Sequence, residues 1–166
     1  MKKRLISIAM AAVMAVGSIP AAGALLDGFN NTSTYSDQFT DVPSTAWYYN
    51  SVKSAYELGI TAGTSASKFS PDQNLTTDQL TVFLARIHAA YHHNEIVEVQ
   101  NPSSWADKYY YYVEQYIDSS YRDSIFGGRD HEQRWHFAYW ISKALPDSAY
   151  TAINNVPDGQ ILDLTE

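Results

Sequence analysis

The chain lacks cysteine and is poor in charge of either sign. None of its 166 residues is Cys, and only 17% are Asp, Glu, Lys or Arg. Without cysteine the fold gains nothing from disulfides and must be held together by packing. Acidic residues outnumber basic ones by 18 to 11. This balance argues against nucleic acid as a partner, because phosphate binding requires a basic surface.

A membrane-spanning apolar run is also missing. The chain starts with a basic stretch at 2–4, an apolar stretch at 5–16 and small residues at 22–24, the pattern of a secretory signal peptide over residues 1–24. The apolar stretch is well short of the roughly 20 residues that cross a bilayer, and the alternative is a buried or anchoring helix. Cleavage removes three basic and no acidic residues, so the net charge falls from −7 to −10. We therefore expect a secreted protein with no membrane span in the mature chain.

Aromatic residues take the place of the missing charge. The chain has 13 Tyr, 6 Phe and 4 Trp, which together make 14% of it. Tyr and Trp suit sugar rings, because they offer an apolar face and a polar group in one side chain. The same residues also fill cores, so the excess must be divided between packing and binding.

The first helical pattern follows an irregular start. Residues 25–38 are rich in Asn, Ser, Thr and Asp without periodicity, and we interpret them as a linker. Two helical patterns follow within residues 39–93. The first is expected to begin near Ser44 or Thr45, either of which can cap a helix. Gly59 is expected to end it, since Gly takes the left-handed conformation at little cost.

The second helical pattern has the clearer start. Thr76 fits the cap position, and Gln79 three residues later completes a capping box. Leu80, Leu84 and Ile87 then recur at helical spacing and form one apolar face. Joined by a loop rich in Gly and Pro, the two helices make a helix-loop-helix unit.

The same unit recurs in residues 94–150. Trp47 is matched by Trp105, 58 positions later, and Leu80 is matched by Phe137, 57 positions later. Both helices of the unit therefore recur in the same order, and the loop between them differs in length by one residue.

The register has two consequences for the fold. It places the tyrosine-rich stretch 109–113 on the first helix of the second unit, although propensity alone favours a strand. It also indicates a third copy over residues 151–166, where 161–164 matches 39–42 before the chain stops. The expected fold is all-α, built from repeated helix-loop-helix units.

Five features of the first unit carry a family resemblance. They are FTDVP at 39–43, Trp47, LGI at 58–60 followed by Gly63, FSP at 69–71, and LTTDQ at 75–79 leading into VFLARI at 82–87. Together they resemble the S-layer homology domain of Gram-positive cell-surface proteins. The resemblance implies helix pairs around a pseudo-threefold axis. It also implies non-covalent binding to a pyruvylated secondary cell-wall polysaccharide, and a location at the cell wall or S-layer.

The resemblance also divides the chain into repeats. Residues 39–93 are repeat one, 94–150 a divergent repeat two, and 151–166 the start of repeat three, so the pseudo-threefold arrangement is incomplete. Two helix pairs without the third leave an apolar face uncovered. We therefore expect either a truncated gene product or self-association through that face.

In this family the second helix opens with a Thr-Arg-Ala-Glu signature whose Arg takes part in ligand binding. Thr77 stands at the Arg position in repeat one, while repeat two retains Arg134. A helix start favours an anion, because its N–H groups are unpaired and carry partial positive charge. An Arg there suits a carboxylate. The alternative is that Arg134 pairs with Asp130 or Glu132 on the surface.

Four further residues are expected at the ligand groove. The resemblance places Trp47 and Trp105 at its edge, with core packing as the alternative role. Asp41 either accepts hydrogen bonds in the groove or caps the turn that follows it. Gly63 either permits close approach of a ligand to the backbone or serves turn geometry.

We expect no catalytic activity, cofactor or metal. The chain has no Gly-x-Ser-x-Gly elbow and no phosphate-binding Gly loop. His88, His92 and His93 share a helix end but lack the Glu of a zinc protease motif. The expected function is anchoring to the cell wall. The alternatives are a protein-interaction scaffold that has lost sugar binding and a cell-wall glycoside hydrolase.

Overall fold

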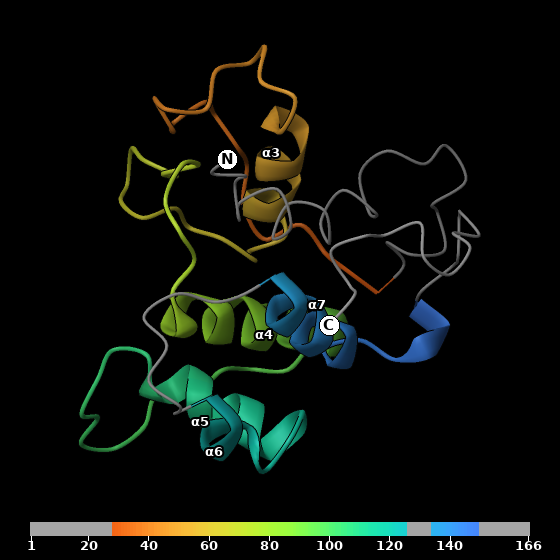
Figure 1. Ribbon diagram of the computed structural model, residues 1–166. Helices are drawn as coiled ribbons and strands as arrows, with labels where there is room; N and C mark the ends of the chain where they lie inside the picture. The colour runs from red at the N-terminus through yellow and green to blue at the C-terminus, as the bar shows by residue number, and fades with distance from the viewer. Residues whose placement is uncertain (1–27, 126–133, 150–166) are drawn as a thin grey trace.

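The computed structural model describes residues 28–125 and 134–149, and within these ranges the chain is helical without a β-strand (Figure 1). This confirms the all-α expectation. Neither the signal segment nor the start of repeat three falls within the described residues. The helices are α3 (Tyr49–Glu57), α4 (Thr77–His92), α5 (Asp107–Tyr116), α6 (Tyr121–Ile125) and α7 (Arg134–Lys143), followed by a 3-10 turn at Asp147–Ala149.

None of these described helices has the length and apolar character needed to cross a bilayer. Helix α4 is the centre of the arrangement, since it packs against both α5 and α7, while α6 packs against α5. Figure 1 shows α3 set apart from this group, on the other side of the loop that leads into α4. The pseudo-threefold arrangement of the repeats stays a prediction.

The start of α4 is the one that the sequence predicts. The Thr76 hydroxyl accepts a hydrogen bond from the Gln79 N–H at 3.3 Å, and the Gln79 side chain accepts one from the Thr76 N–H at 3.0 Å. This capping box satisfies two N–H groups that would otherwise lack partners. Leu80 and Leu84 are fully buried, so the apolar face of the helix is also confirmed.

Helix α3 begins later than expected, and the cap predicted at Ser44 or Thr45 is wrong. Two consecutive turns occupy the segment instead. The Ala46 N–H bonds to the Pro43 carbonyl at 2.8 Å, and the Tyr49 N–H bonds to the Ala46 carbonyl at 3.0 Å. Local turns thus satisfy backbone groups that a helix would have paired. The expected stop is confirmed, since Gly59 is left-handed with φ of 73°.

Buried apolar side chains form two clusters. The smaller one lies at α3 and contains Tyr35, Phe39, Val42 and Val52. The larger one surrounds α4 and takes in side chains from α5, α6 and α7. Tyr35 comes from the segment interpreted as a linker. Over its described residues, 28–38, that segment has no helix or strand, yet it contributes a 7% exposed ring to the core.

The tyrosine run forms α5, which confirms helix over strand. Three of its rings are buried against α4, and their hydroxyls are hydrogen bonded to α4 or to the turn after it. Tyr111 faces the other way and is 54% exposed. The bonds join Tyr109 to Arg86 at 3.1 Å, Tyr110 to Asp78 at 2.8 Å, and Tyr112 to His88 at 2.9 Å and Asn94 at 3.2 Å.

His88 is a partly buried titratable group at this contact. The Tyr112 hydroxyl accepts from the Asn94 side-chain amide at 3.2 Å and is hydrogen bonded to Nδ1 of His88 at 2.9 Å, and a neutral His88 can accept the hydroxyl hydrogen there. The pKa of His88 is lowered to about 4, mainly by partial burial and also by the neighbouring His92 ring, 4.2 Å away between centroids.

The capping box predicts a local stability difference. Thr76→Ala removes the side-chain acceptor at the start of α4, so we expect it to reduce the free energy of unfolding by about 1 kcal/mol. Ser44→Ala is the matched control, because Ser44 is exposed and caps no helix. Urea unfolding of both variants measures the difference. Equal losses would contradict the assignment of the cap.

The lowered pKa of His88 predicts acid sensitivity in a defined window. Between about pH 6.5 and 4 the unfolded chain binds a proton at His88 that the folded protein does not bind. Stability therefore falls as the pH decreases through that window. One pKa unit corresponds to about 1.4 kcal/mol, and screening of the partly exposed ring reduces the expected total loss to about 1–2 kcal/mol.

Urea unfolding of His88→Gln as a function of pH tests this expectation, because Gln can still accept from Tyr112 but does not titrate. We expect a flatter profile than in the unaltered protein. His93→Asn is the control, since His93 is exposed and Asn tolerates its left-handed backbone. An unchanged slope in His88→Gln would refute the assignment.

Candidate functional site

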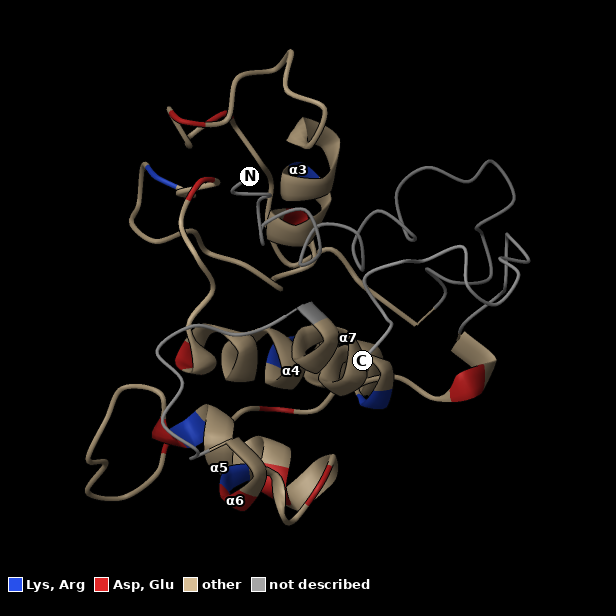
Figure 2. Ribbon diagram, viewed as in Figure 1, with Lys and Arg blue, Asp and Glu red and all other residues tan. Residues whose placement is uncertain are grey.

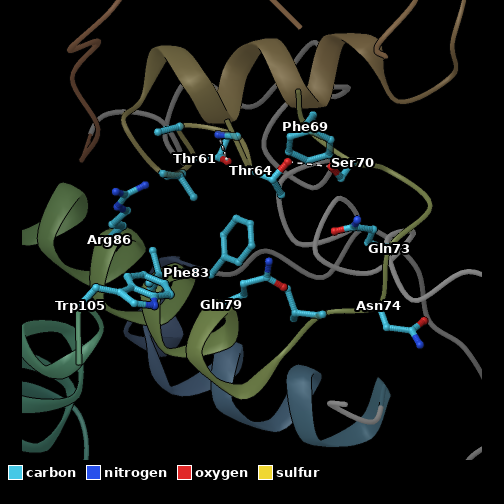
Figure 3. Close-up of a pocket in the computed structure, with 15 residues that line it drawn as sticks. Thr61, Thr64, Phe69, Ser70, Gln73, Asn74, Gln79, Phe83, Arg86 and Trp105 are labelled. Atoms are coloured by element: carbon cyan, nitrogen blue, oxygen red, sulfur yellow. Dashed lines mark hydrogen bonds between the residues drawn. The ribbon is translucent and has the colours of Figure 1, made fainter. Parts of the chain in front are cut away.

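A pocket of about 370 Å³ lies between the α3–α4 loop, one face of α4 and Trp105, which precedes α5 (Figure 3). The loop contributes residues within 60–75, and Trp105 closes the side toward α5. Helix α4 contributes side chains at i, i+3, i+4 and i+7, a stripe beside its buried face. These are Gln79, Val82, Phe83 and Arg86.

The pocket combines an aromatic surface with amide and hydroxyl groups. Arg86 and Trp105 lie at one end, Gln73 and Asn74 at the other, and the Phe83 ring between them (Figure 3). The volume is within the range of about 300–1,000 Å³ that is usual for small-ligand sites. Such a lining suits a ligand that has apolar faces and several hydroxyls, which describes a sugar.

Asp41 braces the wall of the pocket from behind. One carboxylate oxygen accepts from the Phe69 N–H at 2.9 Å, and the other accepts from the Ser70 N–H at 2.7 Å. Burial alone would raise the pKa of Asp41, but these donors bring it below its ordinary value. Ser70 is held in the left-handed region with φ of 63°, an unfavourable conformation for Ser. Its hydroxyl bonds to Thr64 at 2.7 Å on the pocket side.

Gly63 lines the same wall, and its backbone explains why the position is Gly. Its φ is 79°, and a Cβ would lie 2.5 Å from both the Lys68 carbonyl oxygen and the Phe39 ring. No other residue fits there without displacing the loop. Turn geometry therefore accounts for Gly63 whether or not a ligand also contacts it.

The structure brings together three of the residues expected at the site. Trp105 and Gly63 line the pocket, and Asp41 supports it through Phe69 and Ser70. Trp105 is 64% exposed, and its ring meets the Tyr109 ring edge-on at 6.4 Å between centroids. The alternative role of this Trp in the core is therefore wrong.

Of the other three expected residues, two lie outside the pocket lining, and the side chain of the third is outside the described part of the structure. Trp47 is 55% exposed, which excludes core packing for it too, but it packs edge-on against Tyr48 and does not line the pocket. Thr77 is the first residue of α4 and also lies outside the lining. Arg134 begins α7, as expected, and its side chain is outside the described part of the structure.

Sequence reasoning missed Arg86 and Phe83 as pocket residues. A usable signal was present, because Gln79, Phe83 and Arg86 recur at helical spacing next to the buried stripe of α4. Which of the two stripes faces a loop and which faces another helix depends on tertiary packing. The sequence pattern alone does not distinguish them.

Comparisons with known proteins match part of the chain that contains the α3–α4 loop. Residues 38–79 match the family model of the S-layer homology domain, and this domain indicates association with the cell wall or S-layer at the cell surface. The chain is 39% identical over 57 residues to an endoglucanase of Bacillus sp. (strain KSM-635), a match that covers 34% of this chain and 6% of the endoglucanase. No solved structure matches the chain.

The brace formed by Asp41 predicts a loss of stability when its charge is removed. Asp41→Asn places an amide where two N–H donors converge, and only one amide atom can accept, so we expect a loss of about 1–3 kcal/mol. Asp72→Asn is the control, because Asp72 is an exposed acid in the same loop. Urea unfolding at neutral pH measures both variants. A negligible effect of Asp41→Asn would show that the loop holds its shape without the brace.

Proposed function

Because the chain carries an S-layer homology domain at residues 38–79, we propose that the protein anchors itself to the cell wall by binding a wall polysaccharide in the pocket beside α4. The observation that supports this most is the composition of the lining. The loop of the matched domain supplies hydroxyl and amide groups, and Trp105 supplies an exposed aromatic face. Sugar rings are recognised by this combination.

We propose further that the bound polysaccharide is the pyruvylated secondary polymer, as the family resemblance implies. The net charge of −7 works against bulk attraction to an anionic polymer. Figure 2 shows the Lys and Arg residues of the described chain dispersed over loops and helices instead of gathered on one face. Recognition of an acidic sugar therefore depends on specific contacts, and its affinity should decline only gradually with salt.

The pocket favours binding over catalysis. Among its lining residues, all of which belong to the described part of the chain, none is Asp or Glu. Hydrolysis of a glycosidic bond commonly uses two carboxyl groups on either side of that bond. This pocket does not supply such a pair, which supports the role of a non-catalytic anchor.

Co-sedimentation with purified Gram-positive cell walls tests the proposal. We expect the protein to pellet with native walls and Trp105→Ala to bind about 5- to 10-fold more weakly, because it loses an aromatic contact worth about 1 kcal/mol. Trp47→Ala is the matched control. It removes an equally exposed Trp that does not line the pocket, and we expect it to bind like the unaltered protein.

Binding to walls from which pyruvate has been removed distinguishes the proposed anchor from the two alternative functions. An anchor of the proposed kind loses binding to them. A protein-interaction scaffold pellets with neither preparation, and a hydrolase releases soluble sugars from native walls. Either of the last two results would replace the proposed function.

A further inference from the structure

The pocket contains a single formal charge. Of the side chains that line it in the described chain, Arg86 is the one that is ionised at neutral pH, and the rest are apolar, hydroxyl or amide groups. Its guanidinium lies at the same end as Trp105 (Figure 3). A lone cation in an otherwise neutral pocket makes that end selective for an anionic group on the ligand.

Arg86 has no acidic partner within the described residues. One of its nitrogens donates to the Tyr109 hydroxyl at 3.1 Å, and the guanidinium carbon lies 5.5 Å from the centre of the Tyr109 ring. A phenol and a ring face hold the group in place but leave its charge uncompensated. Guanidinium has five N–H donors in a planar fork, so donors remain for a ligand.

The neighbouring cation differs in this respect. Lys108 lies 5.4 Å from the centre of the same Tyr109 ring but forms an ion pair with Glu98. Hydrogen bonding to Glu98 is the main reason that the pKa of Lys108 is raised. Lys108 is therefore compensated and lies outside the pocket lining, whereas Arg86 is uncompensated and inside it.

From these observations we infer that Arg86 is the residue that binds the carboxylate of an acidic sugar in this pocket, with the sugar ring against Trp105. The inference rests on the proposed function and names the cation that makes the pocket selective for an acidic sugar. It moves the anion-binding position away from the start of α4, where Thr77 stands. Nine residues along a helix correspond to about 13 Å, so the ligand lies toward α5.

The geometry explains why this position suits a carboxylate. A carboxylate accepts two parallel hydrogen bonds from the guanidinium fork, and such bonds are about twice as strong as neutral ones. The hydrogen bond and ring contact with Tyr109 restrict the orientation of the Arg86 guanidinium, so less side-chain entropy is lost on binding. The amides at the far end of the pocket remain available for sugar hydroxyls.

Calorimetric titration with two matched probes tests the inference. One is the methyl glycoside of a hexose that carries a 4,6-linked pyruvate ketal, and the other is the methyl ester of the same compound, which is neutral. We expect the full-length protein to bind the acid at least 10-fold more tightly than the ester. Arg86→Gln should bind the acid at least 10-fold more weakly than the unaltered protein does and should keep its affinity for the ester. The variant should therefore bind acid and ester equally.

Two further variants complete the design. Arg86→Lys retains the charge but not the fork, and we expect it to retain only part of the preference for the acid. Lys108→Gln removes the compensated cation beside the same Tyr109 ring, and we expect its preference to stay within about 3-fold of the unaltered protein. Thermal melts of each variant establish that the fold is intact.

The outcomes separate the inference from the function on which it rests. If Arg86→Gln retains the preference for the acid, or if the unaltered protein binds acid and ester equally, the pocket binds sugar but Arg86 is not its anion-binding residue. If neither probe binds and the protein does not pellet with walls, the proposed function itself is wrong.

Discussion

The contact between α4 and α5 is the interaction on which the rest of the structure depends. It holds α5 against α4, and it places Trp105 opposite the loop that follows α3. Buried rings supply the hydrophobic part of this contact, and their hydroxyls would be costly to bury without partners. The chain avoids that cost by pairing each buried hydroxyl of the run with a polar group on or next to α4.

Helix α4 serves two purposes because its two stripes differ. The stripe with Leu80 and Leu84 is fully buried and packs in the core. The adjacent stripe with Phe83 and Arg86 is half-buried and faces the pocket. A helix fixed on one side by packing is a rigid support for side chains on the other. The position of Arg86 is therefore determined by the packing of Leu80 and Leu84 in the core.

The parts that the sequence predicted well are those decided by neighbouring residues. The capping box of Thr76 and the left-handed stop at Gly59 involve contacts within three or four positions, and both are present. The start of α3 was placed wrongly because helix and turn compete over the same few residues, and the local energies are close. The tyrosine run was predicted from a distant part of the sequence instead. Its repeat offset indicated a helix, although the local propensity favoured a strand.

The candidate site was predicted only in part, for a physical reason. Asp41, Gly63 and Trp105 were expected from motifs. Because they are far apart in sequence, the motifs do not indicate that the α3–α4 loop brings them to one pocket. Arg86 lies in VFLARI at 82–87, which is part of the family resemblance, but that stretch did not mark Arg86 as a ligand-binding residue. Whether Arg86 is ion-paired depends on which acidic side chains lie near it after folding. Sequence spacing alone does not show that Arg86 has no ion pair within the described chain.

One consequence follows from the separation in sequence of the residues that line the pocket. Most of the lining comes from residues 60–86, and Trp105 comes from the segment before α5, so the complete pocket exists only while α5 is packed against α4. A ligand that binds only this packed form stabilises the packing by mass action. Such a ligand would hold the two segments together, and a force that separated them would release the ligand in the same event.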